Sequence, residues 1–138
     1  MGEVGGQRDT AYGRVILEHY RRPRNRGPLL EASGRGNADN PLCGDHVRFA
    51  IRTVGERITA ARFEAEACAI CTAAASLLSE MVHGLTLADA AVLPVAQLHA
   101  ALATEIRPAR ERCATLPLDA LRSAVRAAAA KAHGTDGE

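Results

Sequence analysis

The chain has 138 residues, which is enough for one domain with its own core and too few for two. Hydrophobic residues make up 47% and charged residues 24%, as in soluble globular proteins, but aromatic residues supply only 3%, so we expect a small aliphatic core. The 17 Lys and Arg nearly balance the 16 Asp and Glu, and a net charge of +1 gives no general attraction to nucleic acid or anionic membrane.

The sequence also bears on location and on the state of the cysteines. Its opening residues lack the apolar segment of a signal peptide, and no apolar run reaches the ~18 residues that a membrane-spanning helix needs. We therefore expect a cytoplasmic protein that binds no membrane and no nucleic acid. In that reducing compartment four cysteines are unsuited to two structural disulfides, so metal binding or thiol chemistry is the leading interpretation.

The first part of the chain predicts one helix and a long loop. Residues 1–9 are polar and should be disordered. From Tyr12 to Tyr20 apolar positions recur at helical spacing, which predicts a short amphipathic helix that ends before Pro23. The arginines of residues 21–26 are interpreted as a solvated surface. Residues 27–42 have no sustained period and predict a loop, in which residues 34–40 can pair as an irregular edge strand.

The middle of the chain predicts an antiparallel hairpin. Residues 46–54 alternate, with Val47, Phe49 and Ile51 on one face. A turn signal follows at Gly55, and residues 58–66 form a second candidate strand that places small and aromatic residues on one face. Both strands should be half-buried.

The rest of the chain predicts helices. Apolar residues recur over residues 70–81, and Gly84 stands where a glycine cap belongs. Thr86 begins a short helix that Pro94 stops, and another should cover residues 95–102. Residues 104–115 look irregular, so the last helix should start near Leu116, and residues 134–138 should be disordered. The predicted class is α+β: one domain, residues 1–138, with a small antiparallel sheet of about three strands packed against several α-helices.

Three cysteines lie at predicted loops or at junctions between a loop and the next element. Gly44 can adopt backbone angles closed to other residues, so Cys43 and Asp45 could both point toward one centre. Cys68 precedes a helix, whose N-terminal N–H groups favour a thiolate. Cys113 is flanked by arginines, Arg110 and Arg112, which act in the same direction. Three thiolates and a carboxylate match the ligand set of zinc, and thiolates also hold iron–sulfur clusters.

Two other residues, Cys71 and His46, are further candidates for a ligand or a redox partner. Cys68 and Cys71 form a C-x-x-C between a strand and a helix, the context of dithiol oxidoreductases, but no parallel strand and helix alternation precedes it. For Cys71 alone, a small buried core residue is the simpler interpretation. Among the histidines, only His46 is close enough in sequence to the proposed site to be a candidate ligand.

Taken together, these motifs resemble the U-type iron–sulfur cluster assembly scaffold family, which includes IscU, SufU and the N-terminal domain of NifU. The resemblance covers nearly the whole chain. It rests on four segments in the family's order: Tyr12 to Tyr20 followed by Arg22-Pro23-Arg24-Asn25; Asn40-Pro41-Leu42-Cys43-Gly44-Asp45; Cys68-Ala69-Ile70; and Pro108 to Leu116, PARERCATL. The motifs are closest to SufU, although the spacing between Cys68 and Cys113 leaves no room for the insertion typical of many SufU proteins.

The resemblance implies a SufE/NifU-like fold and a site in which Cys43, Asp45, Cys68 and Cys113 hold a zinc ion or a nascent [2Fe–2S] cluster. It also implies the partners: a cysteine desulfurase of the SufS or IscS type, which delivers sulfur as persulfide, and apo iron–sulfur proteins, which receive the product. Cys43 and Cys113 are the candidate persulfide acceptors. We expect a non-enzymatic scaffold that is a monomer or a weak homo-oligomer.

Three functions remain open at this point. The first is a scaffold that assembles a [2Fe–2S] cluster and transfers it. The second is a zinc-bound sulfur acceptor that activates the desulfurase, suggested by Arg112 at a position where IscU-type members carry histidine. The third, of another class, is a C-x-x-C dithiol oxidoreductase that depends on Cys71.

Overall fold

A computed structural model describes the backbone of residues 13–137 and the side chains of residues 13–132. The predictions for residues 1–9, for Tyr12 and for residue 138 therefore lie outside the described part. The elements follow in the order α2 (Arg14–Arg21), β1 (Gly34–Asn40), β2 (Asp45–Val54), β3 (Arg57–Glu66), α3 (Ala69–Met81), α4 (Leu87–Ala91), α5 (Val95–Leu102), the 3-10 helix η1 (Pro108–Arg110) and α6 (Glu111–Gly137). This confirms the predicted α+β class with three strands.

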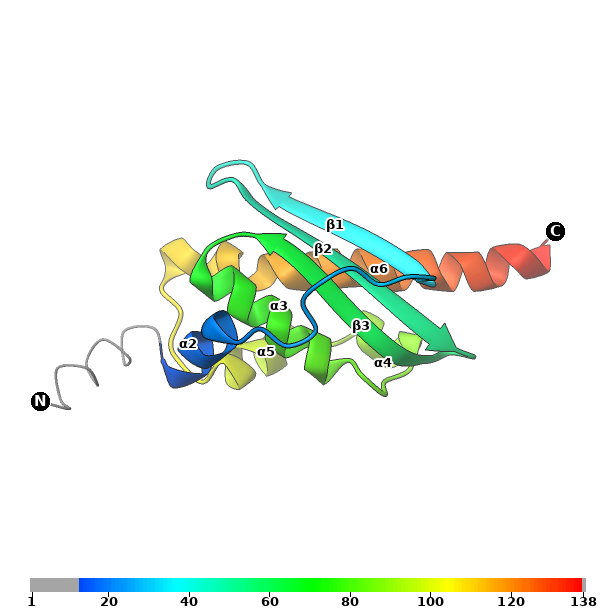
Figure 1. The fold of residues 1–138 in the computed structure, drawn as a ribbon, viewed down its shortest axis with the longest axis horizontal. Helices are drawn as coiled ribbons and strands as arrows, with labels where there is room; N and C mark the ends of the chain where they lie inside the picture. The colour runs from blue at the N-terminus through cyan, green and yellow to red at the C-terminus, as the bar shows by residue number, and fades with distance from the viewer. Residues whose placement is uncertain (1–12, 138) are drawn as a thin grey trace, which may run out of the picture.

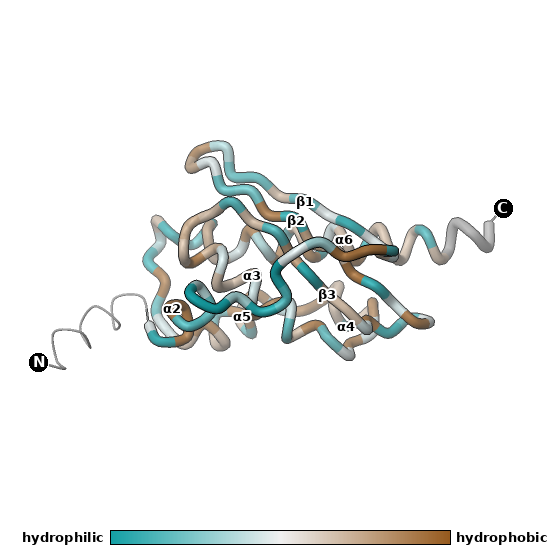
Figure 2. The backbone as a smooth tube through the Cα atoms, in the orientation of Figure 1, coloured by the Kyte–Doolittle hydropathy of each residue, from teal (hydrophilic) through white to brown (hydrophobic). Residues whose placement is uncertain are grey.

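The three strands form one antiparallel sheet in the order β1-β2-β3. Figure 1 shows the helices gathered on one face, with α6 passing behind β1 and β2. Hydrophilic and hydrophobic residues alternate along β2 and β3 in Figure 2, as expected when one face meets helices and the other meets solvent. Phe49 and Phe63 lie directly opposite on the helix-facing side, with ring centroids 6.0 Å apart, and both are 1% exposed. The predicted pattern of strand faces is thus confirmed.

Helix α6 lies unusually close to β1 because two glycines of the strand face it. A Cβ at Gly36 would lie 2.3 Å from the carbonyl oxygen of Ala120, and one at Gly34 would lie 2.2 Å from that of Ala124. Residues two apart share a face of a strand, so the Gly34-x-Gly36 spacing opens a groove for the helix backbone. The segment predicted as an irregular edge strand is therefore a regular seven-residue strand with a specific role.

Residues 24–30 cross the outer face of the sheet and close one of its edges. The N–H of Gly27 donates to the carbonyl of Phe63 at 2.8 Å, and the N–H of Phe63 donates to the carbonyl of Asn25 at 3.0 Å. Two strand arginines donate to carbonyls of this segment: Arg35 to Leu29 at 2.9 Å and Arg62 to Arg26 at 2.7 Å. Part of the predicted solvated arginine cluster thus holds the chain against β3.

The predicted start of the last helix is wrong. Helix α6 begins at Glu111 and includes Pro117, so residues 104–115 are not irregular throughout. Proline has no N–H and normally interrupts a helix, and here it denies a helical hydrogen bond only to the carbonyl of Cys113, close to the helix start. The backbone of residues 134–137, expected to be disordered, is helical up to Gly137. Arg122 of α6 donates a hydrogen bond to the carbonyl of Leu93 at 2.8 Å.

The other predicted helices are confirmed with small differences at their ends. Helix α4 has the predicted cap, since the Thr86 hydroxyl accepts a hydrogen bond from the N–H of Asp89 at 3.1 Å. Helix α5 covers the predicted residues 95–102. Among the helices of the described residues, none combines the length and apolar character needed to cross a membrane.

Candidate metal centre

Cys43 stands on a four-residue turn between β1 and β2. The carbonyl of Asn40 accepts hydrogen bonds from the N–H groups of Cys43 at 3.2 Å and Gly44 at 2.8 Å. Gly44 has a φ of 77°, a left-handed conformation that side chains disfavour, and a Cβ there would meet nothing within 4 Å. Cys43 is exposed, and its neighbour Leu42 is 96% exposed. The turn therefore presents a thiol and an apolar side chain to solvent together.

Asp45 begins β2 and points inward, where it is 6% exposed. Its Oδ1 accepts a hydrogen bond from the N–H of Cys68 at 3.2 Å, but its buried Oδ2 has no hydrogen-bond partner. Burying a carboxylate oxygen without a partner is costly, and such atoms in native proteins usually mark a bound ion or a functional site. Oδ2 is therefore placed to bind a cation.

Cys113 lies in the first turn of α6 and is 6% exposed. Burial, hydrogen bonding with Cys68 and the nearby negative charge of Asp45 raise the pKa of the Cys113 thiol to about 12, although a hydrogen bond with Arg110 acts in the opposite direction. Arg112 does not join Arg110 in this role, because it pairs with Asp119 at 2.5 Å. Of the two flanking arginines, only Arg110 contacts the thiol.

Cys68 is the N-cap residue of α3, as expected, and its carbonyl accepts the first helical hydrogen bond from Thr72 at 2.9 Å. Its side chain adjoins Cys113, with which it hydrogen-bonds. Its backbone N–H holds Asp45. Cys68 thus links the carboxylate of Asp45 to the buried thiol of Cys113.

Three of the four predicted ligands are already grouped. The ligand atoms of Cys43, Asp45 and Cys113 all lie within 4.8 Å of one another. Tetrahedral ligands bound to zinc at about 2.3 Å are roughly 3.8 Å apart, so the group needs to contract by about 1 Å. The side chain of Cys68 hydrogen-bonds with Cys113, but its sulfur is not one of the grouped ligand atoms. The donor set and the unpartnered Oδ2 of Asp45 therefore fit a zinc ion, and the thiolates fit an iron–sulfur cluster as cargo.

The remaining candidates lie outside this group. Cys71 is fully buried, in agreement with its interpretation as a core residue, and burial together with the nearby Asp45 and the other thiols raises its pKa. His46 contacts Asp39 and is not among the grouped ligand atoms. Successive residues of a strand point to opposite faces, so His46 points away when Asp45 points in.

Sequence reasoning missed a polar network that joins α2 to α3 behind the site. The Nδ1 of the buried His19 lies 2.7 Å from the Oγ of Ser76, which also accepts a hydrogen bond from the N–H of Arg24 at 2.8 Å. Ser79 accepts from the Asn25 amide at 3.0 Å. The signal available in the sequence was the presence of two serines, three residues apart, inside an otherwise apolar helix.

The structure is a small α+β domain in which two cysteines and an aspartate form a candidate metal site at one end of the sheet. Residues 11–134 match the family model described as the NifU-like N terminal domain, and the chain belongs to this family. The crystal structure of a nitrogen-fixing NifU-like protein (N-terminal) from Brucella abortus has the same fold, with a TM-score of 0.72, 21% identity, and coverage of 88% of this chain and 96% of that one.

Three curated relatives match most of this chain. The bifunctional protein NifU/MnmA of Rubrobacter xylanophilus is 41% identical over 114 residues, which are 82% of this chain, although the chain spans only 23% of that longer protein. The zinc-dependent sulfurtransferase SufU of Bacillus subtilis is 31% identical, with 85% of this chain and 90% of SufU covered. The iron-sulfur cluster assembly scaffold protein IscU 1 of Archaeoglobus fulgidus is 32% identical, with coverage of 83% and 74%.

Proposed function

We propose that this protein is an iron–sulfur cluster assembly scaffold that accepts sulfur from a cysteine desulfurase, builds a [2Fe–2S] cluster and passes it to apo-proteins. One observation carries the proposal: an exposed thiol, a buried thiol and an oxygen of a buried carboxylate converge within 4.8 Å, and Oδ2 of that carboxylate has no hydrogen-bond partner. Membership of a family whose relatives include named IscU scaffolds supports the same function. In this proposal the four ligands are Cys43, Asp45, Cys68 and Cys113.

Sulfur transfer to such a site is a thiol exchange. The thiolate of Cys43 attacks the terminal sulfur of the desulfurase persulfide, the sulfur–sulfur bond of the donor breaks, and the donor cysteine leaves as a thiolate. A persulfide then stands on Cys43. Cys43 suits this step better than Cys113, the other candidate acceptor, because Cys43 is exposed and Cys113 is buried with a pKa of about 12. The exposed Leu42 offers the donor protein an apolar contact beside the attacked position.

The carboxylate has a separate part in the proposed cycle. Thiolates are the usual ligands of iron–sulfur clusters, so an oxygen ligand at Asp45 should bind more weakly and ease release to an acceptor. The turn that carries Cys43 is exposed, whereas the other ligands lie at the start of β2, at the N-cap of α3 and in α6, which favours an opening on the Cys43 side. We propose that residues 1–138 form one domain with a non-catalytic, cytoplasmic role and with these two classes of partner.

Anaerobic reconstitution tests the scaffold function. The metal-free protein is incubated with ferrous iron, cysteine and a cysteine desulfurase, and visible charge-transfer absorption should appear. Cys43→Ala should abolish it, and Asp45→Cys, which replaces the oxygen ligand with a thiolate, should lengthen the lifetime of the cluster when an apo-ferredoxin is added. His46→Ala is the matched control and should behave as wild type. A well-folded sample without absorption would reject the scaffold function.

A second candidate, a zinc-bound sulfur acceptor that activates the desulfurase, is favoured by one observation. Arg112 pairs with Asp119, so the residue before Cys113 contributes no ligand, and the proposed set of Cys43, Asp45, Cys68 and Cys113 contains three thiols and one carboxylate. That set suits zinc, which supplies a positive charge that keeps the bound thiols deprotonated. The similarity to a zinc-dependent sulfurtransferase supports it. If this function is correct, the protein as purified should contain one zinc ion per chain. Stimulation of the desulfurase that is unchanged in Cys43→Ala would contradict it.

The third function, a dithiol oxidoreductase, gains no support from the arrangement. It requires the sulfur of Cys71 to react with a substrate thiol or disulfide, but Cys71 is 0% exposed and burial raises its pKa. Cys71→Ala should therefore leave sulfur transfer intact.

A further inference from the structure

Strand β1 leaves one long edge of the sheet open. Among the described residues, β1 pairs with β2 along one side and with nothing along the other. The opposite edge, on β3, is closed by residues 25–27. Figure 1 shows β1 as the free border of the sheet, with α6 behind it. An open edge of seven residues carries unpaired backbone groups that can pair with another strand.

The sequence of this edge, Gly-Arg-Gly-Asn-Ala-Asp-Asn, is complementary to itself when two copies run antiparallel. If Asn37 lies at the centre, Arg35 of one copy stands opposite Asp39 of the second copy, and the same pair repeats on the other side of the centre. Both residues belong to the outer face, since Gly34 and Gly36 face α6. We propose that two copies of this chain join through β1 in this register and form one continuous six-stranded sheet.

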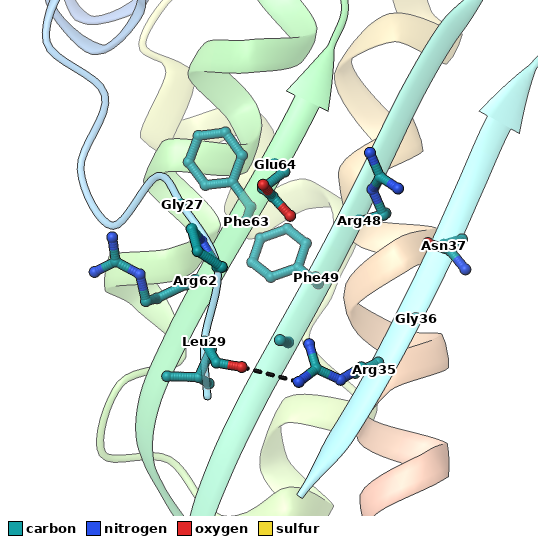
Figure 3. A pocket seen from close by; sticks show the side chains of 12 residues that line it. Gly27, Leu29, Arg35, Gly36, Asn37, Arg48, Phe49, Arg62, Phe63 and Glu64 are labelled. Atoms are coloured by element: carbon teal, nitrogen blue, oxygen red, sulfur yellow. Dashed lines mark hydrogen bonds between the residues drawn. The ribbon is translucent and has the colours of Figure 1, made fainter. Parts of the chain in front are cut away.

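The two charged side chains are available for this pairing. Arg35 is exposed, and Figure 3 shows it turned toward Leu29, to whose carbonyl it donates at 2.9 Å, while Asn37 lies at the free border of the strand. The side chain of Asp39 is 63% exposed and contacts His46 through Oδ1 alone. On association Arg35 exchanges a carbonyl acceptor for a carboxylate, which makes a stronger hydrogen bond. Opposite charges directly across two strands are favourable, and this register provides two such pairs.

The helix beneath β1 also permits a close approach. Because Ser123 lies under Gly36, joining the two β1 edges brings the two copies of α6 side by side. One helical turn beyond Ser123, on the same side, is Ala127, and Ala130 follows; both are exposed. Small side chains allow helices to pack at about 8 Å, the lower end of the usual range. The interface therefore combines a strand pair with a helix pair.

This register keeps the two metal centres apart. The Cys43 turn directly follows β1, and in an antiparallel pair the two turns lie at opposite ends of the joined strands. Both thiols stay exposed, and no metal ion is shared between the copies. Self-association through β1 is therefore independent of metal, and its success or failure is separate from that of the proposed cluster and zinc chemistry.

Sedimentation equilibrium of the metal-free protein in a chelator tests the proposal. The wild type should show a monomer–dimer equilibrium with a Kd on the order of 100 μM, as expected for a small polar interface. Arg35→Asp and Asp39→Arg each oppose like charges twice and should weaken association at least about tenfold. A wild type that stays monomeric up to about ten times that Kd overturns the proposal.

The mixture of the two variants is the decisive measurement. In a heterodimer of Arg35→Asp with Asp39→Arg, both charge pairs are opposite again, so the mixture should dimerise although neither variant does alone. The double variant in one chain should likewise regain wild-type affinity. Arg48→Asp changes the same charge on the same face of the neighbouring strand and should have no effect. A mixture that stays monomeric, or an equal loss in Arg48→Asp, overturns the proposed register.

Discussion

The two sides of the metal centre are built in opposite ways. The turn that carries Cys43 is exposed, and an added Cβ at Gly44 would meet no atom within 4 Å. The helix side carries Cys113 at 6% exposure and rests on Cys71 at 0%. One side has few contacts that resist displacement, and the other belongs to the packed core. This division suits the proposed scaffold, which must both hold a cluster and release it.

The same division separates reactivity from affinity. Buried thiols with raised pKa values are poor nucleophiles but become good ligands once a metal displaces their protons. An exposed thiol can reach a partner protein's persulfide. We infer that Cys43 contributes the chemistry with the partner and that Cys113 contributes retention of the metal.

The largest expected effect is a loss of stability when the packing of α6 against β1 is disrupted. Gly36→Ala places a Cβ 2.3 Å from the Ala120 carbonyl and 2.4 Å from the Ala124 N–H, and these backbone atoms cannot move without shifting α6. It should lower the free energy of unfolding by about 3 kcal/mol. Gly44→Ala meets only the cost of its left-handed φ of 77°, about 1 kcal/mol. Urea denaturation of both variants measures the difference, and equal losses would contradict the division.

Thiol alkylation tests the contrast in reactivity. In the metal-free protein at pH 8, iodoacetamide should modify Cys43 at least about 100-fold faster than Cys113, whose thiolate is scarce at a pKa of about 12. Cys71, fully buried, should react only when the chain unfolds. Mass spectrometry of peptides against time gives the three rates. Added zinc should protect Cys43 and Cys113 together, and protection of only one would show that they do not share a metal.

A smaller effect is expected at Arg110. Its hydrogen bond lowers the pKa of Cys113, so Arg110→Gln should raise that pKa further and slow alkylation of Cys113 roughly three- to tenfold. The rate at Cys43 should not change. Arg107→Gln, a neighbouring exposed arginine, is the control, and an equal slowing there would assign the effect to general surface charge instead.

Much of the fold follows from local sequence signals. The alternation around Phe49 and the periodicity of residues 70–81 predicted the strands and α3 because each element buries one face. The helix start near Leu116 was wrong because Pro117 was taken as a first-turn residue, whereas the helix tolerates it in its second turn. The role of the Gly34-x-Gly36 pair depends on residues 120–128 of α6, which lie more than 80 residues further along the chain, and no local signal shows that contact.

The site was predicted from the motifs that carry the family resemblance, and the structure groups three of its four residues. The orientation of His46 followed from strand alternation and could have been deduced. The different roles of Arg110 and Arg112 could not, because they depend on where Asp119 lies on α6. The assignment of ligands and of the persulfide acceptor stays a prediction until metal analysis of the variants.

The smallest expected effect concerns the network that braces the helix side. Ser76 accepts a hydrogen bond from the Arg24 N–H, and its own proton can be donated to Nδ1 of His19 when the imidazole is neutral. Burial, and next the charge of Arg24, lower the pKa of His19 from its ordinary 6.5, while Glu80 and Glu18 act in the opposite direction. The unfolded chain therefore takes up this proton more readily than the folded protein.

The consequence for stability has a definite sign. As the pH falls below about 6.5, the unfolded chain binds a proton that folded His19 resists, so the free energy of unfolding should decrease toward the lowered pKa and stay level above pH 7. His19→Gln keeps an acceptor for Ser76 but cannot be protonated, so its urea midpoint should fall less than that of the wild type between pH 7.5 and pH 5.5, roughly one unit either side of the ordinary histidine pKa. Carboxylates titrate in both proteins and cancel in this comparison. Parallel pH profiles for the two proteins would show that His19 has the same pKa in the folded protein as in the unfolded chain, and would contradict the lowered pKa.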